Sequence, residues 1–135
     1  MKRILIVDDE PHVIRVMRMS LERNGYEVFT AANGEIALQW LADNTPDVML
    51  TDIDMPRMTG EQLCKEINKS MPGRTFRIIV LTARAELEHR QWSSSFPNMD
   101  FMEKPVSIRK LIARLEAYFS QSMDNDDQER RLSAQ

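Results

Sequence analysis

Three short apolar runs constrain the fold of this chain more than any other feature of its sequence. They cover residues 4–7, 48–50 and 78–81, and each run is apolar at every position rather than at alternate positions. Strands that are covered on both faces have this composition, which is typical of parallel sheets. Residues 27–31 and 101–103 are weaker strand candidates. The sequence therefore predicts a parallel sheet of five strands.

Segments with helical spacing lie between these runs. The first begins near Pro11, a residue favoured in the first turn of a helix, and Gly25 is a suitable stop. The others are expected over residues 34–43, 60–69, 85–95 and 107–119. The segment at 85–95 is the weakest, because only Leu87 and Trp92 are large and apolar within it. Strands that alternate with helices indicate an α/β domain with right-handed crossovers.

Length, charge and cysteine content exclude several classes of protein. The 135 residues fit one domain, and a net charge of −3 gives no general basic surface for nucleic acid. Cys64 is the single cysteine, so an intramolecular disulfide is impossible. No apolar stretch is long enough to span a bilayer or to serve as a signal peptide. We therefore expect a cytoplasmic protein that binds neither a membrane nor, directly, nucleic acid.

The helical pattern ends near residue 120. Residues 121–135 combine acidic and basic side chains with few apolar ones, a composition that is typical of disorder. We expect a folded domain over residues 1–120, followed over residues 121–135 by a disordered tail or by a linker cut from a longer protein.

Polar side chains follow four of the expected strands. Asp8 and Asp9 follow the first strand, Asp52 the third, Thr82 the fourth and Lys104 the fifth. Because ligand sites of parallel sheets lie at the carboxyl ends of the strands, we expect these side chains to converge. Adjacent carboxylates repel one another, and without a cation at least one of them should stay protonated.

A magnesium ion suits such a cluster, because Mg²⁺ prefers hard oxygen ligands and keeps coordination positions free for phosphate. Lys104 adds a positive charge for one phosphoryl oxygen, and the Thr82 hydroxyl can donate to another. Taken singly, the Asp8-Asp9 pair and Thr82 are equally suited to turns or helix caps, and Lys104 to a solvated surface. Together they predict Mg²⁺-dependent phosphoryl transfer.

The residues around these positions resemble a known family. The chain resembles the receiver domains of two-component response regulators in the order of four motifs. These are Asp8-Asp9, then Asp52-Ile53-Asp54-Met55-Pro56-Arg57-Met58-Thr59-Gly60, then Leu81-Thr82-Ala83, then Lys104-Pro105. The resemblance covers about residues 2–119. It implies a flavodoxin-like (βα)5 three-layer sandwich whose five-stranded parallel sheet has the order 2-1-3-4-5.

The resemblance also implies roles for individual residues. Asp52 is the expected phosphoacceptor, which attacks a phosphohistidine on a sensor histidine kinase or a histidine phosphotransfer protein. Lys104 is expected to pair with the phosphoryl group, and the Lys104-Pro105 bond to be cis. Thr82 and Phe101 match the switch pair that carries the signal to an output face. The implied Mg²⁺ ligands are the side chains of Asp8, Asp9 and Asp52 and the backbone carbonyl of Asp54.

Such a protein is a signalling regulator rather than a turnover enzyme. Its only implied chemistry is autocatalytic phosphotransfer and autodephosphorylation. The resemblance further implies a downstream effector protein, which the sequence does not identify, and a monomer or a weak phosphorylation-dependent dimer. Residues 95–100 depart from the family, which usually has small residues with a Gly-Ala pair in this stretch. We expect this departure to alter the output face.

Two alternative interpretations stay open at this point. Asp52-Ile53-Asp54 superficially fits a haloacid-dehalogenase-type phosphatase, although such enzymes place their acidic pair last and are usually longer than 135 residues. A non-phosphorylated scaffold with a receiver fold usually lacks the acceptor or an acidic partner, and this chain has both. Steady turnover of an aryl phosphate would favour the phosphatase, whereas a single stoichiometric phosphorylation would favour the receiver.

Overall fold

A computed structural model of the chain describes residues 1–83, residue 92 and residues 96–133, with side chains described as far as residue 121. The chain divides into two compact units, Met1–Pro105 and Val106–Gln135. All the residues of the predicted site belong to the first unit.

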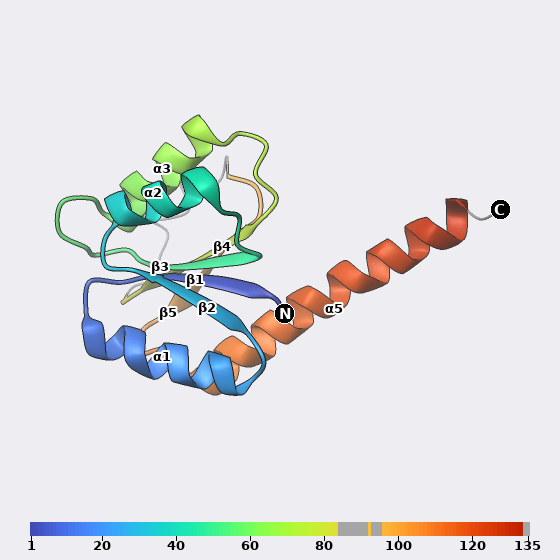
Figure 1. Cartoon of the computed structure of the whole chain (residues 1–135), viewed down its shortest axis with the longest axis horizontal. Coiled ribbons are helices and arrows are strands. Elements are labelled where there is room, and N and C mark those ends of the chain that lie inside the picture. Colours follow the sequence, from blue (N-terminus) through green and yellow to red (C-terminus); the bar gives the residue numbers. More distant parts are fainter. Residues whose placement is uncertain (84–91, 93–95, 134–135) are drawn as a thin grey trace. The chain divides into compact units, whose positions relative to one another are not determined.

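The first unit is built on a five-stranded parallel sheet, which confirms the predicted fold class (Figure 1). The strands lie in the order β2-β1-β3-β4-β5, as the flavodoxin-like arrangement requires. Their bounds are β1 Arg3–Val7, β2 Glu27–Ala31, β3 Val48–Asp52, β4 Arg77–Thr82 and β5 Met99–Glu103.

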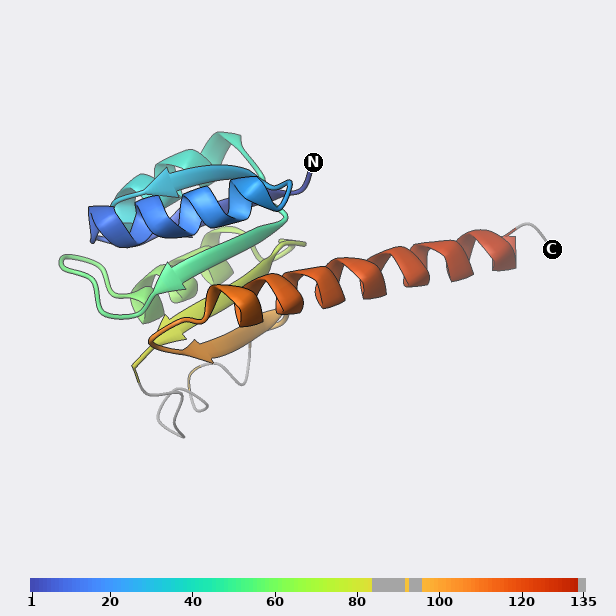
Figure 2. The same ribbon diagram turned by 90° about the horizontal axis from the view of Figure 1, so that it is seen from below.

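Helices cover both faces of this sheet. Helix α1 (Pro11–Arg23) lies on one face, and α2 (Gly34–Asp43) and α3 (Gly60–Ser70) lie together on the other (Figures 1 and 2). The three layers agree with the predicted sandwich. The helix predicted over residues 85–95 lies outside the described residues, except for Trp92.

Local sequence explains where the helices begin. Pro11 occupies the first turn of α1, and the Asn33 side chain caps α2 by accepting from the Ile36 amide at 2.9 Å. Helix α3 has a complete capping box, in which the side chains of Thr59 and Gln62 each accept from the other residue's backbone amide. These caps fix the start of α3, which follows directly on the loop after β3.

Burial explains the continuous apolar runs. All five residues of β3 are buried, as are the last four of β1 and the last five of β4. These strands are covered on both faces, so side chains that point either way enter an apolar layer. The well-packed centre of the sheet gives rigid support to the strand ends that carry the predicted site.

The second unit contains one helix, α5, over Ile108–Ser133. The Ser107 side chain accepts from the Lys110 amide at 3.3 Å and so caps the start of this helix. Residues 121–133, predicted from sequence as a polar tail, continue this helix. No glycine or proline occurs after Pro105, so no residue in this stretch interrupts a helical backbone. The domain boundary near residue 120 stays a prediction.

Candidate functional site

The carboxyl ends of the strands bring three acidic side chains together. One carboxylate oxygen from each of Asp8, Asp9 and Asp52 lies within 4.8 Å of the other two. Asp8 and Asp52 are buried, whereas Asp9 is exposed. The predicted convergence of these carboxylates is therefore present in the structure, with one side of the cluster open to water.

Lys104 brings a positive charge to this cluster. Its Nζ lies 2.8 Å from Asp52 Oδ1, and the lysine side chain is 31% exposed. Burial disfavours the charged ammonium, but the hydrogen bond to Asp52 and the surrounding carboxylates together outweigh it, so that the pKa of Lys104 is raised. The Lys104 amide also donates to the Thr82 carbonyl at 2.7 Å, and the Lys104-Pro105 bond is cis, as expected. The lysine is thus tied by its backbone to the end of β4 and by its side chain to the end of β3.

Asp8 has one carboxylate oxygen with a partner and one without. Its Oδ1 accepts from the Glu10 amide at 2.9 Å, whereas its buried Oδ2 has no hydrogen-bond partner among the described residues. Burial raises the pKa of Asp8, and the neighbouring Asp52 raises it further. A buried anionic oxygen without a donor is costly. A cation bound beside Asp9 and Asp52 would remove this cost, so the donor set fits a hard divalent ion such as Mg²⁺.

Thr82 and Phe101, the predicted switch pair, lie on neighbouring strands. Thr82 is buried at the end of β4, and the register pairs Phe101 on β5 with Val80, two residues before Thr82. Side chains two residues apart on a strand share a face, so Thr82 and Phe101 project on the same side of the sheet. The Phe101 ring is half-buried and meets Trp92 edge-on, with ring centroids 5.8 Å apart. Rotation of Phe101 would therefore disturb this contact.

The response regulator receiver domain is the family whose model matches this chain, over residues 4–116. The chain belongs to this family. The match includes all the residues of the predicted site and all of the sheet except Arg3, and the structure has the strand order that the family implies. The chain is therefore part of a two-component signalling system, in which receiver domains of response regulators interact with histidine kinases.

Curated relatives are response regulators of bacteria. The alkaline phosphatase synthesis transcriptional regulatory protein PhoP of Bacillus subtilis (strain 168) is 33% identical over 97% of this chain and 57% of its own length. Response regulator MprA of Mycobacterium avium (strain 104) is 35% identical over 94% of this chain and 55% of its own length. The chain thus spans little more than half the length of these relatives.

Solved receiver structures share the fold. The receiver domain protein from Methanospirillum hungatei JF-1 has a TM-score of 0.82 at 30% identity, covering 93% of this chain and 98% of its own. Response regulator TrrA from Thermotoga maritima, solved in complex with Mg(2+)-BeF, has a TM-score of 0.74 at 32% identity, with coverages of 87% and 98%. The chemotaxis protein CheY4 of Vibrio cholerae has a TM-score of 0.79 at 29% identity, with the same coverages.

Membership of the receiver family decides against one of the two alternatives that the sequence left open, the phosphatase. The protein is a signalling regulator, and the haloacid-dehalogenase-type phosphatase is set aside. The receiver fold keeps a buried Asp52, its lysine partner and two further acids, which a non-phosphorylated scaffold usually lacks. Among the described residues, no helix combines the length and apolar character needed to cross a membrane.

Two residues for which the sequence predicted no role in the site lie against the backbone of Asp52. The Thr51 hydroxyl donates to the Asp52 carbonyl at 3.0 Å, and Gly60 lies against the same peptide group. The available signal for Thr51 was a polar residue directly after a continuous apolar run. Gly60 belongs to the motif that carries the resemblance, but its contact with Asp52 is visible only in three dimensions.

Proposed function

We propose that Asp52 accepts a phosphoryl group from a phosphohistidine on a sensor histidine kinase or a histidine phosphotransfer protein. The observation that carries this proposal is the 2.8 Å pair between Asp52 Oδ1 and Lys104 Nζ within a cluster of three carboxylates. A nucleophilic carboxylate, an adjacent cation and acids that suit a divalent metal are the parts that phosphoryl transfer needs.

The proposed metal is Mg²⁺, held by the side chains of Asp8, Asp9 and Asp52 and by the backbone carbonyl of Asp54. When bound, the ion would neutralise the carboxylates and the charge of the phosphoryl group. Support comes from the grouping of the three acids and from the buried Oδ2 of Asp8, for which the described part of the chain offers no hydrogen-bond partner. The similar Thermotoga maritima receiver, which was solved in complex with Mg(2+)-BeF, adds to this support.

The chain's own residues then have defined tasks. An Asp52 oxygen forms a bond to phosphorus while the bond from phosphorus to the donor imidazole nitrogen breaks, and the imidazole leaves with that electron pair and takes up a proton. Lys104 turns from Asp52 to a phosphoryl oxygen and donates to it, and the Thr82 hydroxyl donates to another. The product is an acyl phosphate on Asp52, whose hydrolysis would return the domain to its resting state.

Thr82 and Phe101 are proposed to carry the signal. Movement of the Thr82 hydroxyl toward the phosphoryl group would vacate space on the face that it shares with Phe101, and the ring would turn inward. A hydrogen bond to a charged group contributes roughly 1.5–3 kcal/mol, which shifts a two-state equilibrium by about ten- to a hundredfold.

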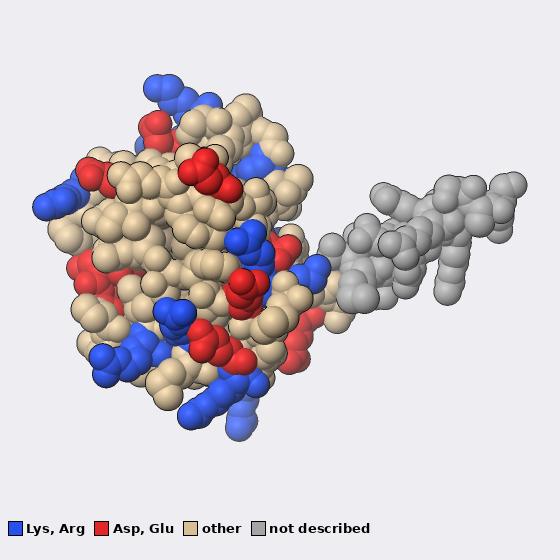
Figure 3. All heavy atoms as spheres, in the orientation of Figure 1, with Lys and Arg blue, Asp and Glu red and all other residues tan. Residues whose placement is uncertain are grey.

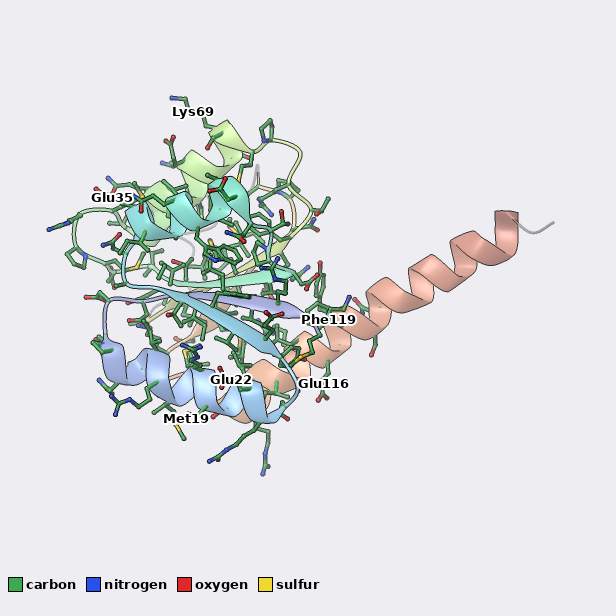
Figure 4. All side chains as sticks on the ribbon, viewed as in Figure 1. Met19, Glu22, Glu35, Lys69, Glu116 and Phe119 are labelled. Carbon is green, nitrogen blue, oxygen red and sulfur yellow. The ribbon has the colours of Figure 1, made fainter. Side chains whose placement is uncertain are left out.

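The exposed side of α1 is the proposed docking surface for the phosphoryl donor. Val16 and Met19 are 54% and 48% exposed there, and Met19 points away from the sheet (Figure 4). Arg15 and Arg23 are exposed on the same helix. Apolar side chains flanked by cations suit a partner helix with an apolar stripe and acidic flanks.

The remaining expectations about this receiver domain stay proposals. We propose residues 1–120 as the receiver domain, a cytoplasmic location, and a monomer or weak phosphorylation-dependent dimer that acts on an effector protein. Direct binding of nucleic acid is not expected, and on the face drawn in Figure 3 basic and acidic side chains are interspersed over the described residues. The relative named as a transcriptional regulatory protein matches this chain over only 57% of its own length. We therefore do not propose transcriptional regulation for this chain from that relative's name.

Intact-mass spectrometry tests the proposal. The protein is incubated with phosphoramidate, a small phosphodonor, with Mg²⁺ or with EDTA. Wild type should gain one phosphoryl group only with Mg²⁺, and Asp52→Asn should gain none. Equal labelling of both proteins, or of neither, would contradict the proposed function.

A further inference from the structure

The peptide bond that follows Asp52 is held at both of its polar ends. The Ile53 amide donates to the Leu81 carbonyl at 3.1 Å, and the Thr51 hydroxyl donates to the Asp52 carbonyl at 3.0 Å. The direction of a side chain depends on the backbone angles of its own residue. Fixing this peptide group therefore limits the directions in which the Asp52 carboxylate can point.

Gly60 approaches the same peptide group at the start of α3. A Cβ atom at position 60 would collide with the Asp52 carbonyl oxygen and lie 2.8 Å from the Ile53 Cα. The Gly60 amide also donates to the Ile53 carbonyl at 2.8 Å. Helix α3, with its start fixed by the capping box, thus begins directly against the backbone beside Asp52, at a distance that only glycine permits.

Packing does not explain the hydroxyl at position 51. Thr51 is fully buried, and the register places it between Val7 on β1 and Val80 on β4. Valine has a similar volume and would continue this row of apolar side chains without burying a polar group. The hydroxyl instead donates to the carbonyl of the residue that we propose as phosphoacceptor.

We propose that Thr51 is a positioning residue for phosphoryl transfer. Its hydroxyl fixes the Asp52–Ile53 peptide group, with Gly60 against that group, so that the Asp52 carboxylate faces Lys104 and the proposed cation site. This inference rests on the proposed function of Asp52. It adds a residue outside the proposed metal ligands and outside the switch pair.

The test compares Thr51→Val, which removes the hydroxyl, with Thr51→Ser, which keeps it. The rate constant for phosphorylation by phosphoramidate is measured by intact mass at saturating Mg²⁺, at a temperature where thermal scans show all variants folded. We expect Thr51→Val to react about tenfold more slowly and Thr51→Ser to stay within about twofold of wild type, since small misplacements of reacting groups have effects of this size or larger.

Rescue by serine separates positioning from stability. A merely structural role would lower the melting temperature of Thr51→Val without changing the rate constant of the folded protein. A wild-type rate for Thr51→Val, or an equal loss in Thr51→Val and Thr51→Ser, overturns the inference while leaving the proposed function intact. Failure of the wild type to be phosphorylated would instead refute the proposed function.

Thr51→Cys covers the case in which Thr51→Val does not fold. A thiol is a weaker donor than a hydroxyl, so this variant should react more slowly than Thr51→Ser. Thr51→Cys reacting as fast as the serine variant would contradict the inference. Gly60→Ala should also slow phosphorylation, because its added Cβ displaces the same peptide group.

Discussion

Among single residues, Lys104 supplies the positive charge that faces Asp52. It pairs with Asp52 before reaction, and we propose that it binds a phosphoryl oxygen during reaction. The pair itself should contribute little to stability, because the lysine is 31% exposed and water screens it. Its main effect is expected on the reaction rate, where an oriented cation meets developing charge.

Lys104→Met tests this role by keeping much of the apolar length of the side chain and removing its charge. We expect the phosphorylation rate constant to fall about 100-fold or more, as when one oriented donor to transition-state charge is lost. Time courses of intact mass with phosphoramidate measure it, and Lys104→Arg, which keeps the charge, should lose less. A rate for Lys104→Met within about twofold of wild type would argue against the assignment.

Asp8 should make the metal-free protein sensitive to pH. Because the folded-state pKa of Asp8 is raised above 3.8, the folded protein holds a proton there that the unfolded chain has already released. Asp8 therefore does not lower the free energy of unfolding below about pH 3.8. The free energy of unfolding falls as the pH rises toward the raised folded-state pKa of Asp8, and it stays lower above that pKa. Removal of the Asp8 charge should therefore stabilise the metal-free protein most at neutral pH.

Asp8→Asn is accordingly expected to stabilise the metal-free protein at pH 7. The gain should be roughly 1 kcal/mol, the scale of relieving an unsatisfied buried group, and it should shrink as the pH is lowered toward 4. Thermal unfolding in EDTA across this range measures it, with Mg²⁺ as a control that should stabilise wild type more than the variant. A lower melting temperature for Asp8→Asn at pH 7 would count against this account of Asp8.

At this scale the sequence predicts which residues meet but not how they are oriented. Asp52, Thr82 and Lys104 converge because each lies at or directly after the end of a strand in a parallel sheet. The apolar runs allowed these strands to be predicted from the sequence. The orientation of the buried Asp8 Oδ2 and the hydrogen bond from Thr51 depend on side-chain rotamers, which the strand pattern does not determine.

At the scale of secondary-structure elements, β4 and β5 carry the proposed switch. Thr82 lies at the end of one strand, and Phe101 on the other strand meets Trp92 edge-on, while Trp92 also meets Phe96 with ring centroids 5.7 Å apart. Any inward turn of Phe101 must change the surroundings of the Trp92 indole. Trp92 is therefore a natural reporter of the switch.

Fluorescence of Trp92 tests the switch in a Trp40→Phe background, which removes the other tryptophan. We expect the emission of Trp92 to change on phosphorylation and to saturate at one phosphoryl group per chain. Thr82→Ala should still accept a phosphoryl group but should lose most of the fluorescence change. An identical change in Thr82→Ala would show that Thr82 does not drive Phe101.

Strand positions were predicted closely, and strand ends less well. The apolar runs marked β1, β3 and β4, but they stopped short of Arg3, Asp52 and Thr82, because hydrophobic patterns end where a strand becomes polar. Asp52 and Thr82, at the carboxyl ends of β3 and β4, belong to the predicted site. At these two ends the functional residues override the apolar pattern, so the strand boundaries were less predictable there.

At the scale of the whole chain, the family match and the last helix end at different residues. The family match ends at residue 116, whereas α5 continues to Ser133. The absence of glycine and proline allows a long helix, while the polar composition led us to expect a tail. Composition and backbone propensity therefore give different expectations for residues 121–133.

Removal of residues 121–135 tests the proposed boundary. We expect the shortened chain, residues 1–120, to be phosphorylated within about twofold of the full rate, because polar terminal segments commonly tolerate truncation. Its helical signal in circular dichroism should fall only by the part that residues 121–133 contribute. Loss of folding on truncation would place part of this segment inside the domain.

Reductive trapping tests the central claim most directly. The chain is phosphorylated in Mg²⁺ by a phosphohistidine-bearing donor protein or by phosphoramidate and treated with borohydride, which reduces an acyl phosphate to the alcohol. Peptide mass spectrometry then locates the reduced residue. The account predicts homoserine at position 52 and unmodified aspartate at Asp8, Asp9 and Asp54. Homoserine at any of those three positions, or at none in a protein that has taken up a phosphoryl group, would contradict it.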